Sequence, residues 1–174
     1  MLYGGSNHQL TKLQIEKTLQ NFGDEDYLVI QNEVSELETI IRVAHQRKMH
    51  IALNPSPFTS QLQKMDYSAI EWLFINEVEG HQMTGEVNAT AVLEHLRRDY
   101  AHINVVLTLG SEGAWCSTPD TTFFIPAFKV QAVDSTAAGD TFTGYFLASY
   151  TQGLPLRACM ILATAASAIS VSRQ

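Results

Sequence analysis

The sequence VDSTAAGDTF, residues 133–142, combines the end of an apolar run, a turn of small residues and the start of a helical pattern. The run before it, 128–133, is typical of a strand, and the segment 138–151 is typical of a helix. Small residues at the turn let a ligand approach the backbone closely. The first amides of a helix have no acceptor within the helix and carry the positive end of its dipole. This stretch therefore predicts a strand, an anion-binding turn and a helix.

Asp140 lies beside the predicted turn. A phosphoryl group that is being transferred gathers negative charge, which the start of a helix would stabilise. A carboxylate at this position is placed to accept the proton of an attacking hydroxyl. The residues alone leave a second interpretation equally open, in which Asp140 only stabilises the helix N-terminus and Gly139 only packs against a strand.

Outward from this stretch, short β-branched runs alternate with amphipathic segments of helical length. Ser35 and Glu38 have the spacing of a capping box, which predicts a helix N-cap at Ser35. The expected strands are 27–30, 50–53, 72–75 and 104–107, the expected helices are 35–48, 88–100, 138–151 and 156–171, and the expected hairpin joins 115–117 to 122–125.

Continuous apolar strands are typical of a parallel sheet that helices cover on both faces. The order of elements predicts an α/β protein, a three-layer α/β/α sandwich with a mostly parallel, Rossmann-like sheet and a hairpin on its C-terminal side. No repeat or linker divides the chain, so residues 1–174 are expected to form a single domain.

The composition, with 45% hydrophobic and 17% charged residues among 174, is that of a soluble globular protein. A formal net charge of -7 argues against a nucleic-acid or anionic-membrane partner, because both select basic faces. Cys116 and Cys159 have no metal-ligand spacing and are expected to be buried thiols. There is no signal-peptide pattern, and 158–171 is too short for a membrane span, which predicts a cytoplasmic protein.

Both ends of the sequence suggest a truncated protein. The chain opens on a loop with Gly4 and Gly5 and closes just after a helical pattern, at Arg173 and Gln174. An open α/β sheet normally has more strands than this sequence contains. We therefore expect a fragment, or an unusually short relative of a longer protein.

The segment 134–140, DSTAAGD, resembles the D-[TS]-x-[GA]-A-G-D signature of the ribokinase-like (PfkB-type) carbohydrate kinases. Within that family the similarity is closest to the ribokinases. The agreement continues through LNPSP at 53–57, NEVE at 76–79 and TLGSEG at 108–113. It implies a truncated ribokinase-like fold without the family's N-terminal third, its small β-sheet lid and its extreme C-terminus.

The resemblance assigns roles around the phosphate. It makes Asp140 the catalytic base, and it makes the turn Ala137, Ala138 and Gly139 the anion hole. It further implies nucleotide contacts at Asn54, Thr108, Gly110 and Thr164, although relatives often have histidine where this chain has Thr164. An ordinary turn that needs a glycine with positive φ is the alternative for Gly110.

For the sugar and the metal ions, the resemblance points to four further residues. Glu33 would contact the sugar, and Glu79 would organise Mg²⁺ through water. Asp134 and Thr136 would belong to a monovalent-cation site, with K⁺ as its candidate ion, which this chain cannot complete. The alternatives are a surface carboxylate for Glu33 and a solvated helix carboxylate for Glu79.

The implied function is ATP-dependent, Mg²⁺-requiring phosphorylation of a sugar hydroxyl, with ATP and a small-molecule sugar as partners. Two alternatives remain open: a catalytically inactive remnant that at most binds nucleotide, and a kinase for another substrate class such as nucleosides. Missing strands would also leave exposed sheet edges, through which the chain is expected to self-associate.

Overall fold

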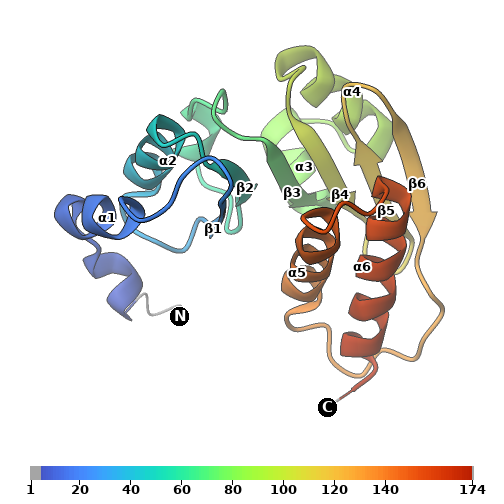
Figure 1. The fold of residues 1–174 in the computed structure, drawn as a ribbon. Helices are drawn as coiled ribbons and strands as arrows, with labels where there is room; N and C mark the ends of the chain where they lie inside the picture. Colours follow the sequence, from blue (N-terminus) through green and yellow to red (C-terminus); the bar gives the residue numbers. More distant parts are fainter. Residues whose placement is uncertain (1–4, 174) are drawn as a thin grey trace. The chain divides into compact units, whose positions relative to one another are not determined.

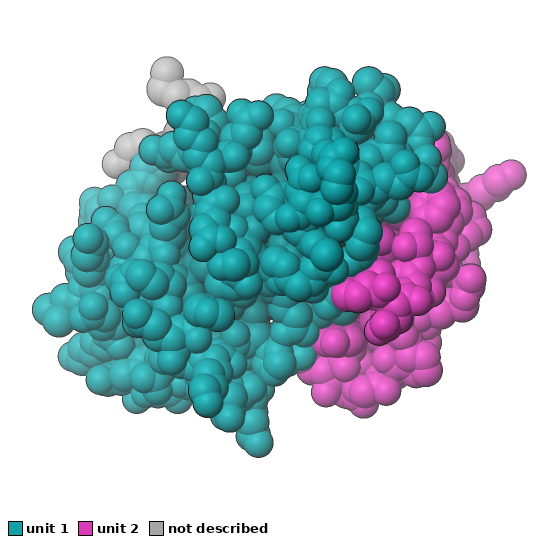
Figure 2. Space-filling model, turned by 90° about the horizontal axis from the view of Figure 1, so that it is seen from above, with its two compact units in different colours: residues 1–105 teal, residues 106–174 magenta. Residues whose placement is uncertain are grey.

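The computed structural model describes residues 5–173, so Gly4 of the opening loop lies outside the described residues. The chain divides into two compact units, residues 1–105 and 106–174, which Figure 2 colours teal and magenta. The prediction that the whole chain forms a single domain stays a prediction. Each unit has its own helices and strands, and strand β4 (Asn104–Thr108) contains the boundary.

Unit 1 contains three parallel strands, β1 (Tyr27–Gln31), β2 (His50–Asn54) and β3 (Trp72–Asn76) (Figure 1). β1 pairs with β2 from Tyr27 opposite His50 to Gln31 opposite Asn54, and β2 pairs with β3 at Ala52 and Leu53. The side chains of β2 and β3 are almost entirely buried. The strands predicted from the apolar runs are confirmed to within one residue.

The helices of unit 1 are α1 (Lys12–Leu19), α2 (Leu37–Gln46), α3 (Glu77–Thr84) and α4 (Ala89–Asp99), with short 3-10 turns at Gly5–Gln9 and Leu62–Lys64. α1 and α2 pack together, and α2 also packs on β2. The predicted N-cap at Ser35 is wrong. The N-cap is Glu36 in a left-handed conformation, because the Ser35 hydroxyl and amide both donate to the Asn7 carbonyl.

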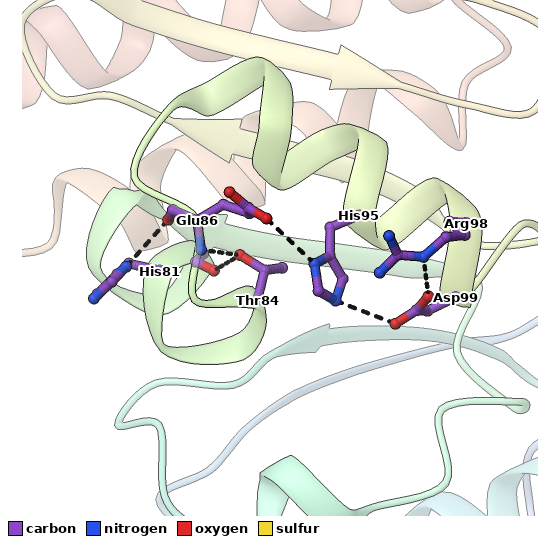
Figure 3. Close-up of polar contacts among 7 residues, drawn as sticks. His81, Thr84, Glu86, His95, Arg98 and Asp99 are labelled. Atoms are coloured by element: carbon purple, nitrogen blue, oxygen red, sulfur yellow. Dashed lines mark hydrogen bonds and ion pairs between the residues drawn. The ribbon is translucent and has the colours of Figure 1, made fainter.

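Polar contacts stabilise the connection between α3 and α4 (Figure 3). The His95 ring lies 3.2 Å from an Asp99 carboxylate oxygen and 3.9 Å from a Glu86 carboxylate oxygen. The Arg98 side chain donates to Asp99 at 2.8 Å, and this bond holds the pKa of the Asp99 carboxyl below its ordinary value. At the other end of the connection, the Glu86 amide donates to the Thr84 hydroxyl. These exposed contacts fix the turn without forming a site.

Unit 2 contains the antiparallel hairpin of β5 (Gly113–Ser117) and β6 (Thr122–Pro126), followed by α5 (Ala138–Tyr150) and α6 (Leu156–Val171). The two helices run side by side (Figure 1), and α6 packs on both strands of the hairpin. Burial raises the pKa of the Cys116 thiol to about 12, and Cys159 is also buried. The predicted hairpin and buried thiols are confirmed.

Two other differences from the sequence-based expectation matter. Residues 128–133 are an extended loop, not a strand, because the β6 strand ends at Pro126 and no neighbouring strand pairs with the loop. The helix α1 was not predicted, because only Ile15 and Leu19 of its eight residues are buried and its apolar periodicity is weak. Within residues 5–173, no helix has both the length and the apolar character that crossing a bilayer requires.

The packing of β2 predicts that Leu53→Ala will lower the free energy of unfolding by about 2–5 kcal/mol, because Leu53 is 0% exposed and the change leaves a cavity. Leu13 in α1 is 74% exposed, so Leu13→Ala should change stability by no more than about 0.5 kcal/mol. Urea unfolding of the two variants measures the difference. Equal losses would contradict the assignment of Leu53 to the core.

Candidate functional site

The turn before α5 has a left-handed residue at its centre. Ala137 is the N-cap of α5, with φ 59° and ψ 13°, a conformation that a non-glycine residue adopts only when its surroundings hold it there. On its N-terminal side, the Thr136 amide donates to the Asp134 carboxylate at 2.8 Å. On its C-terminal side, the Thr141 amide donates to the Ala137 carbonyl at 2.9 Å, which is the first bond of the helix.

The end of α6 holds this turn in place. The amides of Val133 and Asp134 both donate to the Val171 carbonyl, at 2.7 and 3.2 Å. One turn earlier in α6, the Ser167 hydroxyl donates to the Ala138 carbonyl at 3.1 Å. Hydrogen bonds to α6 therefore fix both the segment that leads into α5 and the first residue of α5.

The amides of the predicted anion hole differ in their partners. The Ala138 amide donates to the Ser135 carbonyl at 3.2 Å. The Gly139 amide has no acceptor among the described residues. A Cβ atom built on Gly139 would meet no atom within 4 Å, and Gly139 is one of the residues that line the cavity of unit 2. Gly139 is thus the position in this turn where an anion can reach the positive end of the helix.

A cavity of about 510 Å³ lies in unit 2, in front of the start of α5. It brings together five of the residues predicted from the sequence: Thr108, Gly110, Ala138, Gly139 and Thr164. Its other walls are mostly apolar and come from the loop after β6 and from the two helices, with Phe128, Val130, Phe142, Ala168 and Val171 among them. A cavity of this volume, mostly apolar with a few polar groups in its lining, has the properties of a small-molecule site.

Thr164 lies in the wall of this cavity, on α6. Its side chain is buried, and its hydroxyl donates to the Met160 carbonyl at 2.7 Å. The hydroxyl proton is therefore used within the helix, and only the lone pairs of the oxygen can face a ligand. Thr164 can shape the cavity and accept a hydrogen bond, but it does not offer a donor.

Gly110 and Gly113 form the turn between β4 and β5. Gly110 has φ +52° and Gly113 has φ +136°, so the turn needs glycine at both positions, as the turn interpretation of Gly110 predicted. A Cβ on Gly113 would lie 2.2 Å from the Ile125 carbonyl oxygen, whereas one on Gly110 would meet nothing within 4 Å. Gly110 therefore owes its glycine to the backbone conformation of the turn, and Gly113 also lets β5 and β6 approach each other.

The four predicted residues of unit 2 that do not line the cavity are exposed: Asp134, Thr136, Ala137 and Asp140. Asp140 lies in the first turn of α5, next to the open Gly139 amide, where its negative charge also suits the helix dipole. Hydrogen bonds from Thr136 hold the pKa of the Asp134 carboxyl below its ordinary value, so Asp134 stays anionic at neutral pH. Both interpretations of Asp140 fit this position.

In unit 1, Glu33 and Asn54 lie at the carboxyl ends of two paired parallel strands, β1 and β2. The Glu33 side chain is exposed. The Asn54 carboxamide oxygen accepts from the Ser56 amide at 3.0 Å. The carboxyl ends of parallel strands are the edge at which α/β proteins bind ligands, and both predicted residues are found there.

Glu79 is buried, whereas the alternative interpretation from the sequence predicted an exposed carboxylate on a helix. Its side chain is only 6% exposed, so it is not a solvated helix carboxylate. It forms a reciprocal capping box at the start of α3, in which the Glu79 carboxylate accepts from the Asn76 amide and the Asn76 carboxamide accepts from the Glu79 amide, both at 2.9 Å. Among residues 5–173, no three His, Cys, Asp or Glu side chains converge as in a metal site.

The sequence did not reveal that the segment 127–132 is part of the site. The sequence predicts a strand over 128–133, the run that leads into the turn. In the structure Phe128 and Val130 are about half exposed and line the cavity. The signal that could have identified a loop is Pro126 together with Ala127, just before the run, because proline commonly ends a strand.

Comparisons with known proteins place the chain among carbohydrate kinases. The family model of the pfkB family carbohydrate kinases matches residues 1–174. The ribokinase of Schizosaccharomyces pombe is 29% identical, and the deoxyribokinase of Salmonella typhi is 30% identical. These alignments cover 100% and 99% of this chain and 58% of each relative, so the chain spans little more than half the length of these relatives.

The crystal structure of a ribokinase from Cryptococcus neoformans, in complex with ADP, superposes with a TM-score of 0.85 and 27% identity. The superposition covers 100% of this chain and 61% of that one. The ribokinase-like α/β fold predicted from the sequence is thereby confirmed.

Gly113 and Gly139 both line the cavity, and we expect their replacement by alanine to have different effects on stability. Gly113→Ala should lower the free energy of unfolding by about 2 kcal/mol, because the new Cβ meets the Ile125 carbonyl and φ is unfavourable. Gly139→Ala should be tolerated within about 0.5 kcal/mol, because its Cβ points into open space at the first turn of a helix. Thermal unfolding followed by circular dichroism compares them. If Gly139→Ala were the more damaging change, the described turn would be wrong.

Proposed function

The chain belongs to the pfkB family of carbohydrate kinases, and from this premise we propose that it serves in the ATP-dependent phosphorylation of a sugar hydroxyl. One observation carries the proposal: the cavity of unit 2 is lined by Ala138 and Gly139 at the start of α5, and Asp140 is the next residue of that helix. Its apolar walls suit a nucleobase, and the start of α5 suits the phosphates.

In the proposed reaction, Asp140 acts as the base. The sugar hydroxyl oxygen forms a bond to the γ-phosphorus, the bond from that phosphorus to the β–γ bridging oxygen breaks, and the hydroxyl proton goes to the Asp140 carboxylate. ADP and the sugar phosphate are the products. The Gly139 amide and the α5 dipole stabilise the charge on the transferring group. The Ala138 amide contributes less, because it already donates to Ser135.

The chain's own residues would support the metal ions only in part. Mg²⁺ commonly binds through nucleotide phosphates and one or two carboxylates, and it keeps several waters. Glu79 fits a role at the edge of such an assembly, since its carboxylate is held in place by the Asn76 amide. The anionic Asp134 and the Thr136 carbonyl fit a weak monovalent-cation site, with K⁺ as the proposed ion.

Glu33 is the proposed contact to the sugar, at the carboxyl edge of β1. The partners of the chain are then a sugar and ATP. The predicted self-association has one supporting feature, the edge strand β1, in which Val29 is 53% exposed. Self-association and a cytoplasmic location both stay predictions.

A second candidate function is nucleotide binding without transfer. It is favoured by the position of the cavity, which lies entirely within residues 106–174, whereas Glu33 belongs to unit 1. The two candidates agree on the nucleotide and differ on the transfer step. A binding measurement therefore tests what they share, and an activity measurement separates them.

Gly139→Asp should abolish Mg·ATP binding, because a carboxylate would occupy the open space where the phosphates bind. Gly139→Asn has nearly the same shape without the charge, and it should weaken binding less than Gly139→Asp does. Isothermal titration calorimetry with Mg·ATP measures both. Unchanged binding in a folded Gly139→Asp variant would exclude phosphates from this turn.

Asp140→Asn should lower the rate of ribose phosphorylation by about 10²-fold or more and leave Mg·ATP affinity within about twofold, because it removes the base and keeps the shape. Asp134→Asn, a matched change on the other side of the turn, should have a smaller effect on the rate. A coupled assay for ADP release with D-ribose tests this. Wild-type binding without any turnover would favour the second candidate function.

A further inference from the structure

Asn32 follows directly after β1 and connects two loops of unit 1. Its side-chain amide donates to the Pro57 carbonyl at 2.7 Å, and its backbone amide donates to the Ser56 carbonyl at 3.1 Å. Ser56 in turn donates its amide to the Asn54 carboxamide oxygen. Two hydrogen bonds from Asn32 therefore join the loop that carries Glu33 to the loop that follows β2, and the bond between Ser56 and Asn54 holds the second loop at the end of its strand.

The other side of Glu33 is held as well. Three residues beyond Asn32, the Ser35 amide and hydroxyl donate to the Asn7 carbonyl at 2.9 and 3.1 Å. Glu33 itself is exposed and lies between these two points of attachment. A side chain on a loop that is fixed at both ends loses less conformational freedom when it binds a ligand than one on a free loop.

We propose that Asn32 is a positioning residue for the sugar, which holds the Glu33 carboxylate in register with the loop at Asn54. This inference rests on the proposed function, because it takes Glu33 as the sugar contact. Only the carboxamide nitrogen of Asn32 can donate to Pro57. Aspartate has the same shape but no donor, and its carboxylate would face the Pro57 carbonyl oxygen.

A purely structural role of Asn32 predicts a different result. If Asn32 only stabilised the two loops, its loss would lower the unfolding temperature and leave both ligand affinities unchanged in the folded protein. If Asn32 positions Glu33, the affinity for the sugar falls much more than the affinity for the nucleotide, because Asn54 is the only predicted nucleotide contact in these loops and the cavity of unit 2 is lined by other residues.

The test uses the full chain, with titrations of D-ribose and of Mg·ATP followed by calorimetry. Asn32→Asp and Asn32→Ala should each weaken ribose binding about fivefold, which corresponds to one lost hydrogen bond. Both should keep the wild-type affinity for Mg·ATP within about twofold. Ser35→Ala is the matched control, because it removes one side-chain bond to Asn7 and keeps the backbone bond, and it should change ribose binding less than either Asn32 variant.

Hydrogen exchange of the ligand-free chain shows whether the variants remain folded and whether the connection is lost. In Asn32→Asp, exchange should rise in 31–36 and in 55–59 and stay unchanged in α5. If the Asn32 variants bound ribose as tightly as the wild type does, the positioning role would be overturned and the proposed function would stand. A folded wild type that binds neither ribose nor Mg·ATP would overturn the proposed function as well.

Discussion

Two hydrogen bonds from the Val133 and Asp134 amides to the Val171 carbonyl determine where the chain enters α5. They connect the loop after the hairpin to the last turn of α6, and three residues later Ala137 takes a left-handed conformation before the helix begins. The energetic cost of that conformation is compensated by the surrounding contacts. The cavity beside this turn is lined by Ala138 and Gly139 of α5 and by Thr164 and Val171 of α6. The cavity, the open Gly139 amide and the position of Asp140 all depend on this one junction.

The carboxyl edge of unit 1 follows a different constraint. Parallel strands end at the same edge of a sheet, so β1 and β2 bring the segments 31–35 and 54–57 together without any specific motif. Side-chain amides then fix the loops to each other, and Glu79 and Asn76 do the same at the start of α3 by capping each other. Polar residues that would be expected to bind ligands are thus also used to make the loops rigid, which is what precise positioning requires.

The sequence predicted the strands of unit 1, the hairpin and the two last helices, because a run such as Trp72–Asn76 is decided by burial on both faces. It also predicted that Thr108, Gly110, Gly139 and Thr164 share one site, but only through the family signature. It failed at 128–133, where alternating apolar residues line a cavity instead of a sheet, and at Ser35, where the Asn7 carbonyl competes with a helix cap. A local sequence pattern indicates the periodicity of apolar side chains, but it does not indicate which group distant in the sequence will bond to a given residue.

The proposed function requires a nucleotide to bind in the cavity of unit 2 with its phosphates at the start of α5. Hydrogen–deuterium exchange of the whole chain, with and without Mg·ATP, tests it most directly, because it locates the ligand without requiring turnover. If a nucleotide binds there, exchange should slow in 108–113, in 135–142 and along α6 around Thr164. Slower exchange confined to other segments, or no change in a folded chain at saturating Mg·ATP, would contradict it.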